Sequence, residues 1–397
     1  MNRLEDICPR PDRLGAQKTE PLAPALCPTS VWICEDPEQA EIILSGQEKG
    51  FVYQRDAHPN AELFAQKCRE LHRAEEVAVT SSGMSALALA LLSQVQPGDH
   101  VIASNMLYGR SLLLLKQEAT RLGISCSVLD ANKPDELQQS ITPHTKLVVV
   151  ETISNPRLFV ADVSALAEIC HSGGAKLLVD NTFATPMLCR PLELGADFVL
   201  ESVSKVMNGH SDVMLGLLCG RTKDWDRVPL VSSAWGLASS PFDCWLAYRG
   251  MMTMHLRMER ASENAAKAAE FLTTQSNVEQ VDYPGLPNHP QHELAQKQFS
   301  NRYGAMVTFR LRGGSEAAES FIRGAKRIPF CPSLGDVSTT LSHPESTSHR
   351  GLTAEDRESL GITGGTIRLS VGIESPEFVI EAIEEGMRVV SCHATTW

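Results

Sequence analysis

The sequence predicts an α/β protein with a mostly parallel central sheet, followed by a smaller C-terminal α+β domain. Between about residues 61 and 245, short apolar runs alternate with longer helical stretches, which is typical of parallel strands joined by crossover helices. A long amphipathic stretch follows, and then two more strand patterns and a last helical pattern. We therefore divide the 397 residues into an arm (1–60), an α/β domain (61–245) and a C-terminal domain (246–397).

The first 60 residues predict an extended arm with one short helix near 37–45. They contain seven prolines and little hydrophobic periodicity, so regular structure is limited there. The arm also carries Trp32, Ile33, Phe51 and Val52, and such side chains need a surface to cover them. A neighbouring subunit would supply that surface, and a loose terminus is the alternative.

The elements of the two domains follow from their periodicity. In the α/β domain, we expect strands at 77–80, 101–104, 126–129, 147–151, 177–180, 198–201 and 215–219. Helices or helical turns are expected between them at 84–94, 112–123, 163–172 and 191–195. The run over 240–272 predicts one long connecting helix. The C-terminal domain is expected to contain strands at 305–311 and 366–372 and a helix at 376–390.

Composition excludes several classes of function. The net charge of −12 repels phosphate backbones, so nucleic acid is not an expected partner. The apolar stretches, such as 86–92 and 112–115, are far shorter than the ~20 residues that span a bilayer. No secretory signal is visible at the start, and 11 cysteines are scattered without a Cys-x-x-Cys pair. We expect a cytoplasmic protein with reduced thiols, no membrane contact and no metal site.

Polar segments follow three predicted strands at the sheet edge where open parallel sheets bind ligands. The first strand runs through Thr80-Ser81-Ser82-Gly83-Met84-Ser85 into a helix. A helix start of this kind offers free N–H groups and hydroxyls to a phosphate. An ordinary serine cap at a glycine turn would give the same pattern.

Asp180 and Lys205 end the other two segments. Asp180 closes the apolar run 177–180, where a carboxylate needs a cation to stay ionised, and a protonated ring nitrogen would serve. Lys205 follows the next strand and the hydroxyls of Ser202 and Ser204, where desolvation can make it a nucleophilic amine able to form a Schiff base. A turn aspartate and a solvated lysine are the alternatives. Together with the phosphate turn, these residues describe a site for pyridoxal 5′-phosphate.

The chain resembles the Cys/Met metabolism, or trans-sulfuration, family of pyridoxal-phosphate enzymes. This family includes cystathionine γ-lyase, methionine γ-lyase, cystathionine γ-synthase and O-acylhomoserine sulfhydrylases. The shared segments are YQR at Tyr53, SSGMSA at Ser81, MLYG at Met106, ETISNP at Glu151, VDNTFATP at Val179, ESVSKVMNGHSD at Glu201, SLGD at Ser333, HPES at His343 and IRLSVGIE at Ile367. The resemblance implies fold-type I, the aspartate-aminotransferase-like fold, and pyridoxal 5′-phosphate as cofactor.

The resemblance also implies residue roles. Lys205 would bind the cofactor and act as the general base, Asp180 would contact its ring nitrogen, and Tyr108 would stack on the ring and protonate the departing thiolate. Further cofactor-binding residues would be Ser82, Gly83, Met84, Asn155, Ser202 and Ser204, and substrate-binding residues would be Ser333 and Arg368. Tyr53 and Arg55 would reach the phosphate site of a neighbouring subunit, which implies a homo-oligomer, as in a tetramer built from two dimers.

Two positions depart from the family pattern. Ser338 stands where many cystathionine enzymes carry Glu, and Arg110 stands where methionine γ-lyases typically carry Cys. Arg110 is a candidate for binding an acidic substrate tail, and a solvated arginine is the alternative. We expect γ-elimination on a sulfur amino acid, a carbon-sulfur lyase activity. The alternatives are γ-replacement on an O-acylhomoserine and, more remotely, a catalytically silent scaffold.

Overall fold

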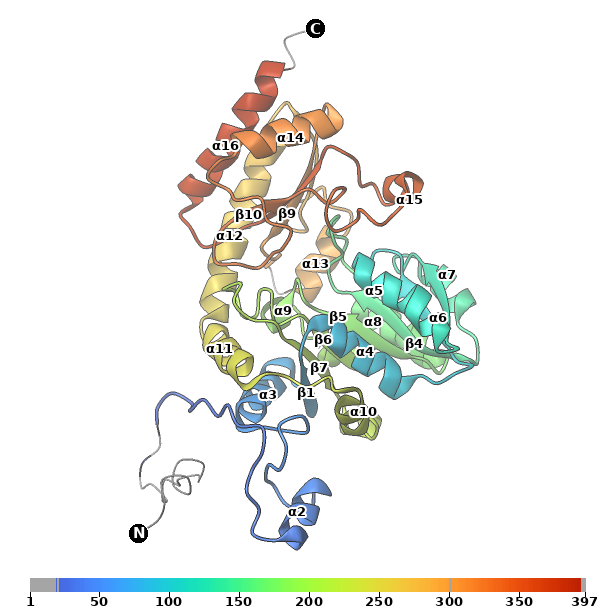
Figure 1. Ribbon diagram of the computed structural model, residues 1–397. Helices are drawn as coiled ribbons and strands as arrows, with labels where there is room; N and C mark the ends of the chain where they lie inside the picture. The colour runs from blue at the N-terminus through green and yellow to red at the C-terminus, as the bar shows by residue number, and fades with distance from the viewer. Residues whose placement is uncertain (1–18, 20, 300–301, 394–397) are drawn as a thin grey trace.

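The structure, a computed structural model, describes residue 19 and residues 21–299 and 302–393. It has two lobes, an α/β domain and a smaller C-terminal domain, connected along the long helix α12 (Met254–Thr273) (Figure 1). The predicted fold class is confirmed. The parts of the predicted arm at 1–18 and 20, and of the predicted C-terminal domain at 300–301 and 394–397, lie outside the described residues.

The α/β domain is built on a seven-stranded sheet. Its strands are β1 (Glu76–Thr80), β2 (His100–Ser104), β3 (Ser125–Leu129), β4 (Thr145–Glu151), β5 (Lys176–Asp180), β6 (Phe198–Glu201) and β7 (Gly216–Gly220). Their order is β1-β7-β6-β5-β4-β2-β3. All neighbouring pairs are parallel except those of β7, which runs antiparallel to both β1 and β6. Each strand overlaps a predicted one, and the sheet is mostly parallel as expected.

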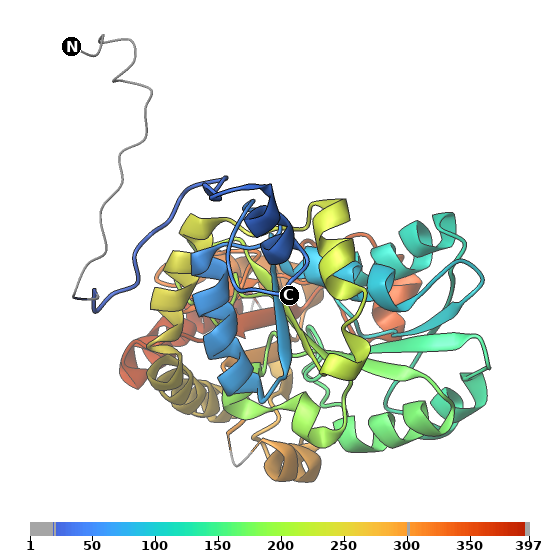
Figure 2. The same ribbon diagram turned by 90° about the horizontal axis from the view of Figure 1, so that it is seen from below.

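Helices cover both faces of this sheet (Figure 2). Successive strand side chains point to opposite faces, so Leu178 and Phe198 join one core cluster while Val179 and Val199 belong to clusters on the other side. The first face is covered by α4 (Gly83–Gln94), α5 (Gly109–Leu113), a π-helical turn (Leu114–Glu118), α6 (Ala119–Arg121) and α10 (Val228–Trp235). The second face is covered by α3 (Pro59–His72), α8 (Val163–Ser172), α11 (Pro241–Met251) and the first half of α12. Shorter segments are α7 (Pro134–Ser140), α9 (Thr185–Leu188) and 3-10 turns at Pro191–Leu194 and Thr222–Asp224.

The predicted single helix over 240–272 is wrong, because the helical structure is interrupted at Met252 and Thr253, between α11 and α12. The carbonyl of Gly250 accepts the Thr253 N–H at 3.3 Å and the Arg257 guanidinium at 3.0 Å. These donors replace the regular ladder of the helix. The hydrophobic periodicity continues across the break because both helices face the same core.

Arg257 contacts both this interruption and the loop at residues 206–207. Its guanidinium, which is buried, donates to Val206 O and Met207 O at 2.8 Å each as well as to Gly250 O. We expect Arg257→Met to lower the free energy of unfolding by about 2–4 kcal/mol, since it removes the donor from the carbonyls of Val206 and Met207. Urea unfolding measures this. The control Arg260→Met, three residues along the same helix and more exposed, should change stability by less than ~1 kcal/mol, and equal effects of the two substitutions would contradict the assignment.

The C-terminal domain is an antiparallel sheet with helices packed against it. Its strands are β8 (Val278–Asp282), β9 (Met306–Leu311), β10 (Thr340–Ser342) and β11 (Thr366–Ser370), in the order β10-β11-β9-β8. The second half of α12, α14 (Gly314–Gly324) and α16 (Pro376–His393) contact the sheet or one another. Smaller helices are α13 (His292–Gln298) and α15 (Ala354–Ser359). The α+β prediction is confirmed, although β8 and β10 were not predicted.

Helix α12 links the two hydrophobic cores. Met258 and Ala261 belong to the core of the α/β domain, whereas Ala265 and Leu272 belong to that of the C-terminal domain. The division at residue 246 stays a prediction, and it falls within α11. No helix within the described ranges combines the length and the apolar character that a membrane span requires.

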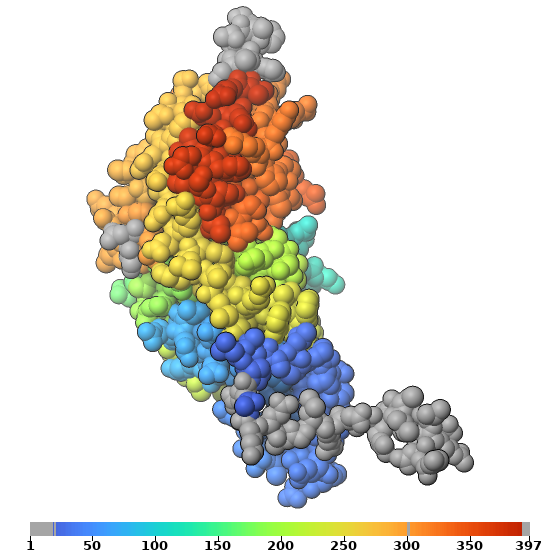
Figure 3. Space-filling model, turned by 90° about the vertical axis from the view of Figure 1, so that its left-hand side faces the viewer, coloured from blue at the N-terminus to red at the C-terminus, as the bar shows by residue number. Residues whose placement is uncertain are grey.

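The described part of the arm extends away from the body at the end opposite α16 (Figures 1 and 3). It contains α2 (Pro37–Leu44), which begins after the capping side chain of Asp36 and confirms the predicted short helix. Trp32 packs on Phe51 with ring centroids 5.4 Å apart, and Ile33 is 63% exposed. The arm also contacts the α/β domain, where Pro24 O accepts from Trp245 Nε1 at 2.8 Å. Its apolar surface at Ile33 is left open in the single chain.

Candidate active site

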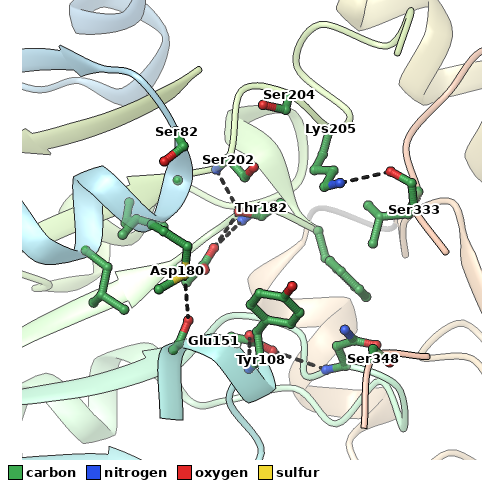
Figure 4. A pocket seen from close by; sticks show the side chains of 18 of the residues that line it. Ser82, Tyr108, Glu151, Asp180, Thr182, Ser202, Ser204, Lys205, Ser333 and Ser348 are labelled. Carbon is green, nitrogen blue, oxygen red and sulfur yellow. Dashed lines mark hydrogen bonds between the residues drawn. The ribbon is translucent and has the colours of Figure 1, made fainter. Parts of the chain in front are cut away.

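A cavity of about 290 Å³ lies at the carboxyl ends of the parallel strands, and Arg368 of β11 and residues 332–334 line it from the C-terminal domain. Figure 4 shows the side chains around it. The cavity collects every predicted cofactor-binding, substrate-binding and catalytic residue except Tyr53, Arg55 and Arg110. Its polar lining residues are Ser82, Tyr108, Ser111, Glu151, Asn155, Asp180, Thr182, Ser202, Ser204, Lys205, Ser333, Ser348 and Arg368. Gly83 and Met84 also line it.

The turn from β1 into α4 presents backbone N–H groups that can bind a phosphate. Ser82 caps the helix and accepts the Ser85 N–H at 3.1 Å, so the first helical N–H groups, at Gly83 and Met84, have no acceptor within the helix. A Cβ on Gly83 would lie 2.9 Å from Ser202 Cβ, so only glycine allows the turn to approach Ser202. The result is an anion-binding helix start facing the cavity.

The two predicted phosphate hydroxyls differ in their availability. Ser202 Oγ has no hydrogen-bond partner among the residues that the structure describes, whereas Ser204 Oγ donates to Leu215 O at 3.2 Å and accepts Leu215 N–H at 3.0 Å. Ser202 is therefore free to donate to a phosphate. Ser204 would have to give up its bond to Leu215 O, so its role as a ligand stays a prediction.

Asp180 lies at the end of β5 and lacks a cationic partner within the described ranges. Its carboxylate accepts only from Thr182, from the amide at 3.0 Å and from the hydroxyl at 2.5 Å. Burial raises the pKa of Asp180. A protonated ring nitrogen placed here would supply the missing positive charge and favour the carboxylate form.

Glu151 is the neighbour of Asp180 in the β4–β5 register. It accepts N–H bonds from Tyr108 at 2.8 Å and Asn155 at 3.2 Å, and burial and then the charge of Asp180 raise its pKa well above the usual range. Glu151 thereby fixes the backbone of Tyr108, whose ring faces the cavity (Figure 4).

Lys205 comes from the turn after β6, and its Nζ donates to Ser333 Oγ at 2.9 Å (Figure 4). Burial, and after it the nearby Arg368 guanidinium, lowers the pKa of Lys205. The loop has little freedom, because Arg257 holds Val206 and Gly335 packs closely on it. A positioned amine with a lowered pKa suits both imine formation and proton transfer.

Arg368 brings a buried positive charge from the C-terminal domain. It is 3% exposed, donates to Asn155 Oδ1 at 2.7 Å and to Ser333 O at 3.0 Å, and its Nε has no partner in the described structure. Burial lowers the pKa of Arg368 to about 10, so the guanidinium remains charged at neutral pH. An unused N–H on a buried guanidinium fits a substrate carboxylate.

Sequence reasoning missed several polar residues of this site, and Glu151 and Thr182 are the two that contact predicted residues. Glu151 ends a predicted strand just as Asp180 does, so the strand-end rule that selected Asp180 could have selected it. Thr182 follows Asp180 by two residues, a spacing that lets a hydroxyl bond the carboxylate. No group of three or more potential ligand side chains among the described residues could hold a metal ion.

Three predicted site residues lie outside the cavity. Tyr53 and Arg55 line a separate hollow together with Ser81, and the Arg55 guanidinium lies 5.2 Å from the centroid of the Tyr53 ring. Arg110 is exposed and lines an adjoining cleft. Their predicted roles need, respectively, a second subunit and a substrate that extends beyond the cavity.

Taken together, the cavity fits pyridoxal phosphate. It offers an anion-binding helix start, the Asp180 carboxylate without a cationic partner among the described residues, and a positioned amine. The residues that would hold the cofactor are those around Ser82, with Ser202, Asp180 and Lys205.

Comparisons with known proteins agree with this fit. The family described as Cys/Met metabolism PLP-dependent enzyme, where PLP is pyridoxal phosphate, matches residues 11–388. L-methionine gamma-lyase of Porphyromonas gingivalis is 39% identical over 369 residues, covering 92% of each chain. O-succinylhomoserine sulfhydrylase of Pseudomonas aeruginosa is 39% identical over 350 residues, covering 88% of this chain and 87% of that protein.

A solved structure extends the likeness to the fold. A Campylobacter jejuni protein whose structure contains N′-pyridoxyl-lysine-5′-monophosphate at its own position 205 has a TM-score of 0.91 and 26% identity, covering 94% of this chain and 97% of that one. The chain thus belongs to the Cys/Met metabolism family of PLP-dependent enzymes, and pyridoxal 5′-phosphate is its cofactor.

Proposed function

We propose that this enzyme is a carbon-sulfur lyase that eliminates the γ substituent of a sulfur amino acid. The observation that carries the proposal is the junction of Lys205, Ser333 and Arg368, which places a basic amine beside a carboxylate anchor, with Tyr108 lining the same cavity. The relatives named methionine and cystathionine γ-lyase support elimination.

The bound cofactor supplies an electron sink that acidifies the C–H bonds near the substrate amine. Arg368 holds the substrate carboxylate by charge-assisted hydrogen bonds, and Ser333 orients the Lys205 amine. Lys205 removes the proton at Cα and then moves protons at the neighbouring carbons. Loss of the Cβ proton drives cleavage of the Cγ–S bond, and Tyr108 donates a proton to the departing sulfur.

Replacement is the second candidate function, and it is favoured by the likeness to an O-succinylhomoserine sulfhydrylase. The two reactions share every step up to loss of the γ substituent. They differ in whether water releases an oxo acid or a thiol adds at Cγ. A catalytically silent scaffold would have no need of Lys205, Asp180 and Arg368 assembled in one cavity.

The test is a panel of methionine, cystathionine, homocysteine and O-acylhomoserines, assayed with and without an added thiol. We expect a 2-oxo acid from a sulfur amino acid without added thiol. Product formation only when a thiol is added would identify a replacement enzyme. Absence of turnover and of the visible absorbance of bound cofactor would support the scaffold.

We also propose that the enzyme acts in the cytoplasm as a homotetramer made of two dimers, with the arm at the dimer contact. Tyr53 and Arg55 do not line the cavity of their own chain, and the arm carries open apolar side chains such as Ile33. An arginine that serves the phosphate of a neighbouring subunit accounts for both observations.

Mixed dimers test the shared site. If Arg55→Ala and Lys205→Ala each inactivate the enzyme, co-expressed subunits should recover activity, because one site of a mixed dimer combines an intact Arg55 with an intact Lys205. Up to about a quarter of wild-type activity is expected from random pairing into two-fold dimers. Mixed dimers confirmed by native mass spectrometry but lacking activity would refute the shared site.

A further inference from the structure

A second hollow of about 560 Å³ adjoins the active-site cavity. One wall is formed by α5 and the π-helical turn that follows it, and the other by residues 346–353 and the start of α15. Tyr108, Pro332 and Ser348 line both hollows. The cleft therefore begins where the cavity ends, at the residue proposed to protonate the leaving group (Figure 4 shows Tyr108 and Ser348 at this side of the cavity).

The cleft carries positive charge on both walls. Arg110 and Lys116 line one wall and Arg350 the other, and none of the three forms an ion pair within the described residues. Asp356 is the one acidic side chain among the lining residues. Arg357, which does not line the cleft, is already paired with Glu345 at 3.6 Å. Three unpaired cations at one cleft are notable in a chain whose net charge is −12.

The orientation of the substrate links this charge to the chemistry. If Arg368 holds the α-carboxylate and Lys205 works at Cα, the side chain extends past Tyr108, and anything beyond Cγ enters the cleft. A small neutral group such as a methyl would leave the three cations in water. A carboxylate at the far end of the leaving group would contact these cations. Two positively charged walls also raise the local concentration of such an anion.

We propose that this cleft is a specificity subsite that binds a terminal carboxylate on the leaving group. The preferred substrate is then a γ-substituted amino acid whose thioether or ester arm ends in a carboxylate. This proposal rests on the proposed function, because it uses the same substrate orientation. It extends the predicted role of Arg110 to Lys116 and Arg350 on the two walls of the cleft.

Two matched substrate pairs test it on the holoenzyme. O-succinyl-L-homoserine and O-acetyl-L-homoserine differ by a distal carboxymethyl group on an ester. S-(2-carboxyethyl)-L-homocysteine and S-propyl-L-homocysteine differ by a carboxylate or a methyl at the end of a thioether. The carboxylate-bearing member should have the higher kcat/KM, by about two- to fivefold for each exposed ion pair gained, and the preference should shrink as salt is raised. A preference within one pair alone identifies the kind of arm and supports the subsite, whereas absence of preference in both pairs overturns it.

Charge-removing variants assign the preference to the cleft. Arg110→Gln and Lys116→Gln should each lower the succinyl-to-acetyl ratio of kcat/KM by about two- to fivefold, and the double variant by more. The control is Arg121→Gln, which removes the same charge from α6, outside the cleft, and should leave the ratio unchanged. An equal fall of the ratio in Arg121→Gln would mean that overall charge, and not the cleft, sets the preference.

A binding measurement separates this inference from the proposed function. L-2-aminosuberate and L-2-aminooctanoate lack a leaving group at Cγ and differ only in a terminal carboxylate or methyl, so either can be titrated into the holoenzyme while the cofactor absorbance is followed. We expect the aminosuberate to bind more tightly and Arg110→Gln to reduce that difference. Equal binding overturns the subsite even if the enzyme proves to be a lyase. Tighter aminosuberate binding by an enzyme that eliminates nothing from the substrate panel keeps the subsite and overturns the lyase.

Discussion

Lys205→Ala is expected to lower turnover by more than about a thousandfold, since a positioned acid-base group alone contributes about 10²–10⁴ and the amine also carries the cofactor. The visible absorbance of the bound cofactor should be lost together with activity. The fold should remain, because the only hydrogen bond made by Lys205 Nζ among the described residues goes to Ser333 Oγ. The loop itself is held by Arg257 and by Gly335 against Val206.

The measurements for Lys205→Ala are steady-state turnover, an absorbance spectrum and urea unfolding. Lys267→Ala is the matched control, because that lysine is exposed on α12, and it should retain turnover and spectrum. A Lys205→Ala enzyme that turned over at a rate near wild type would show that another group carries the reaction.

The fold was predictable largely because most strands of the central sheet are short apolar runs with polar ends. Leu177 to Val179 and Phe198 to Leu200 are all buried, and Asp180 and Lys205 were found because they follow such runs. β8 and β10 were missed for the opposite reason. β8 is mostly half-buried and reads VEQVD, and β10 has only three residues.

Other parts of the site depend on contacts distant in sequence. The bond from Arg368 to Asn155 joins residues 213 apart, and no local pattern around Arg368 distinguishes it from a surface arginine. Only the family resemblance selected it. The interruption between α11 and α12 is likewise bridged by a side-chain contact from Arg257 to Gly250, which hydrophobic periodicity does not report.

Asp180→Asn is expected to lower kcat by about ten- to a thousandfold while the cofactor stays bound. An opposite charge shifts a neighbouring pKa by about 1–3 units, so a neutral amide would reduce the protonated fraction of the ring nitrogen by a corresponding factor and weaken the electron sink. The amide oxygen can still accept the Thr182 N–H and hydroxyl that the carboxylate accepts now. The local structure and the Lys205 attachment should therefore survive, and the absorbance spectrum together with kcat would measure both effects.

The same substitution should raise the stability of the protein freed of cofactor. Burial raises the pKa of Asp180 in the folded chain, so the unfolded chain releases this proton at a lower pH than the folded chain does. The wild type therefore loses stability as pH rises from the ordinary aspartate pKa through the raised one, and asparagine has no such loss. The stability advantage of Asp180→Asn over wild type should be largest at neutral pH and shrink in acid, as urea unfolding at several pH values would show.

Loss of activity with a gain in cofactor-free stability would mark Asp180 as a carboxylate kept for the cofactor. Near-normal activity, or a variant less stable than wild type at neutral pH, would make it a turn residue instead.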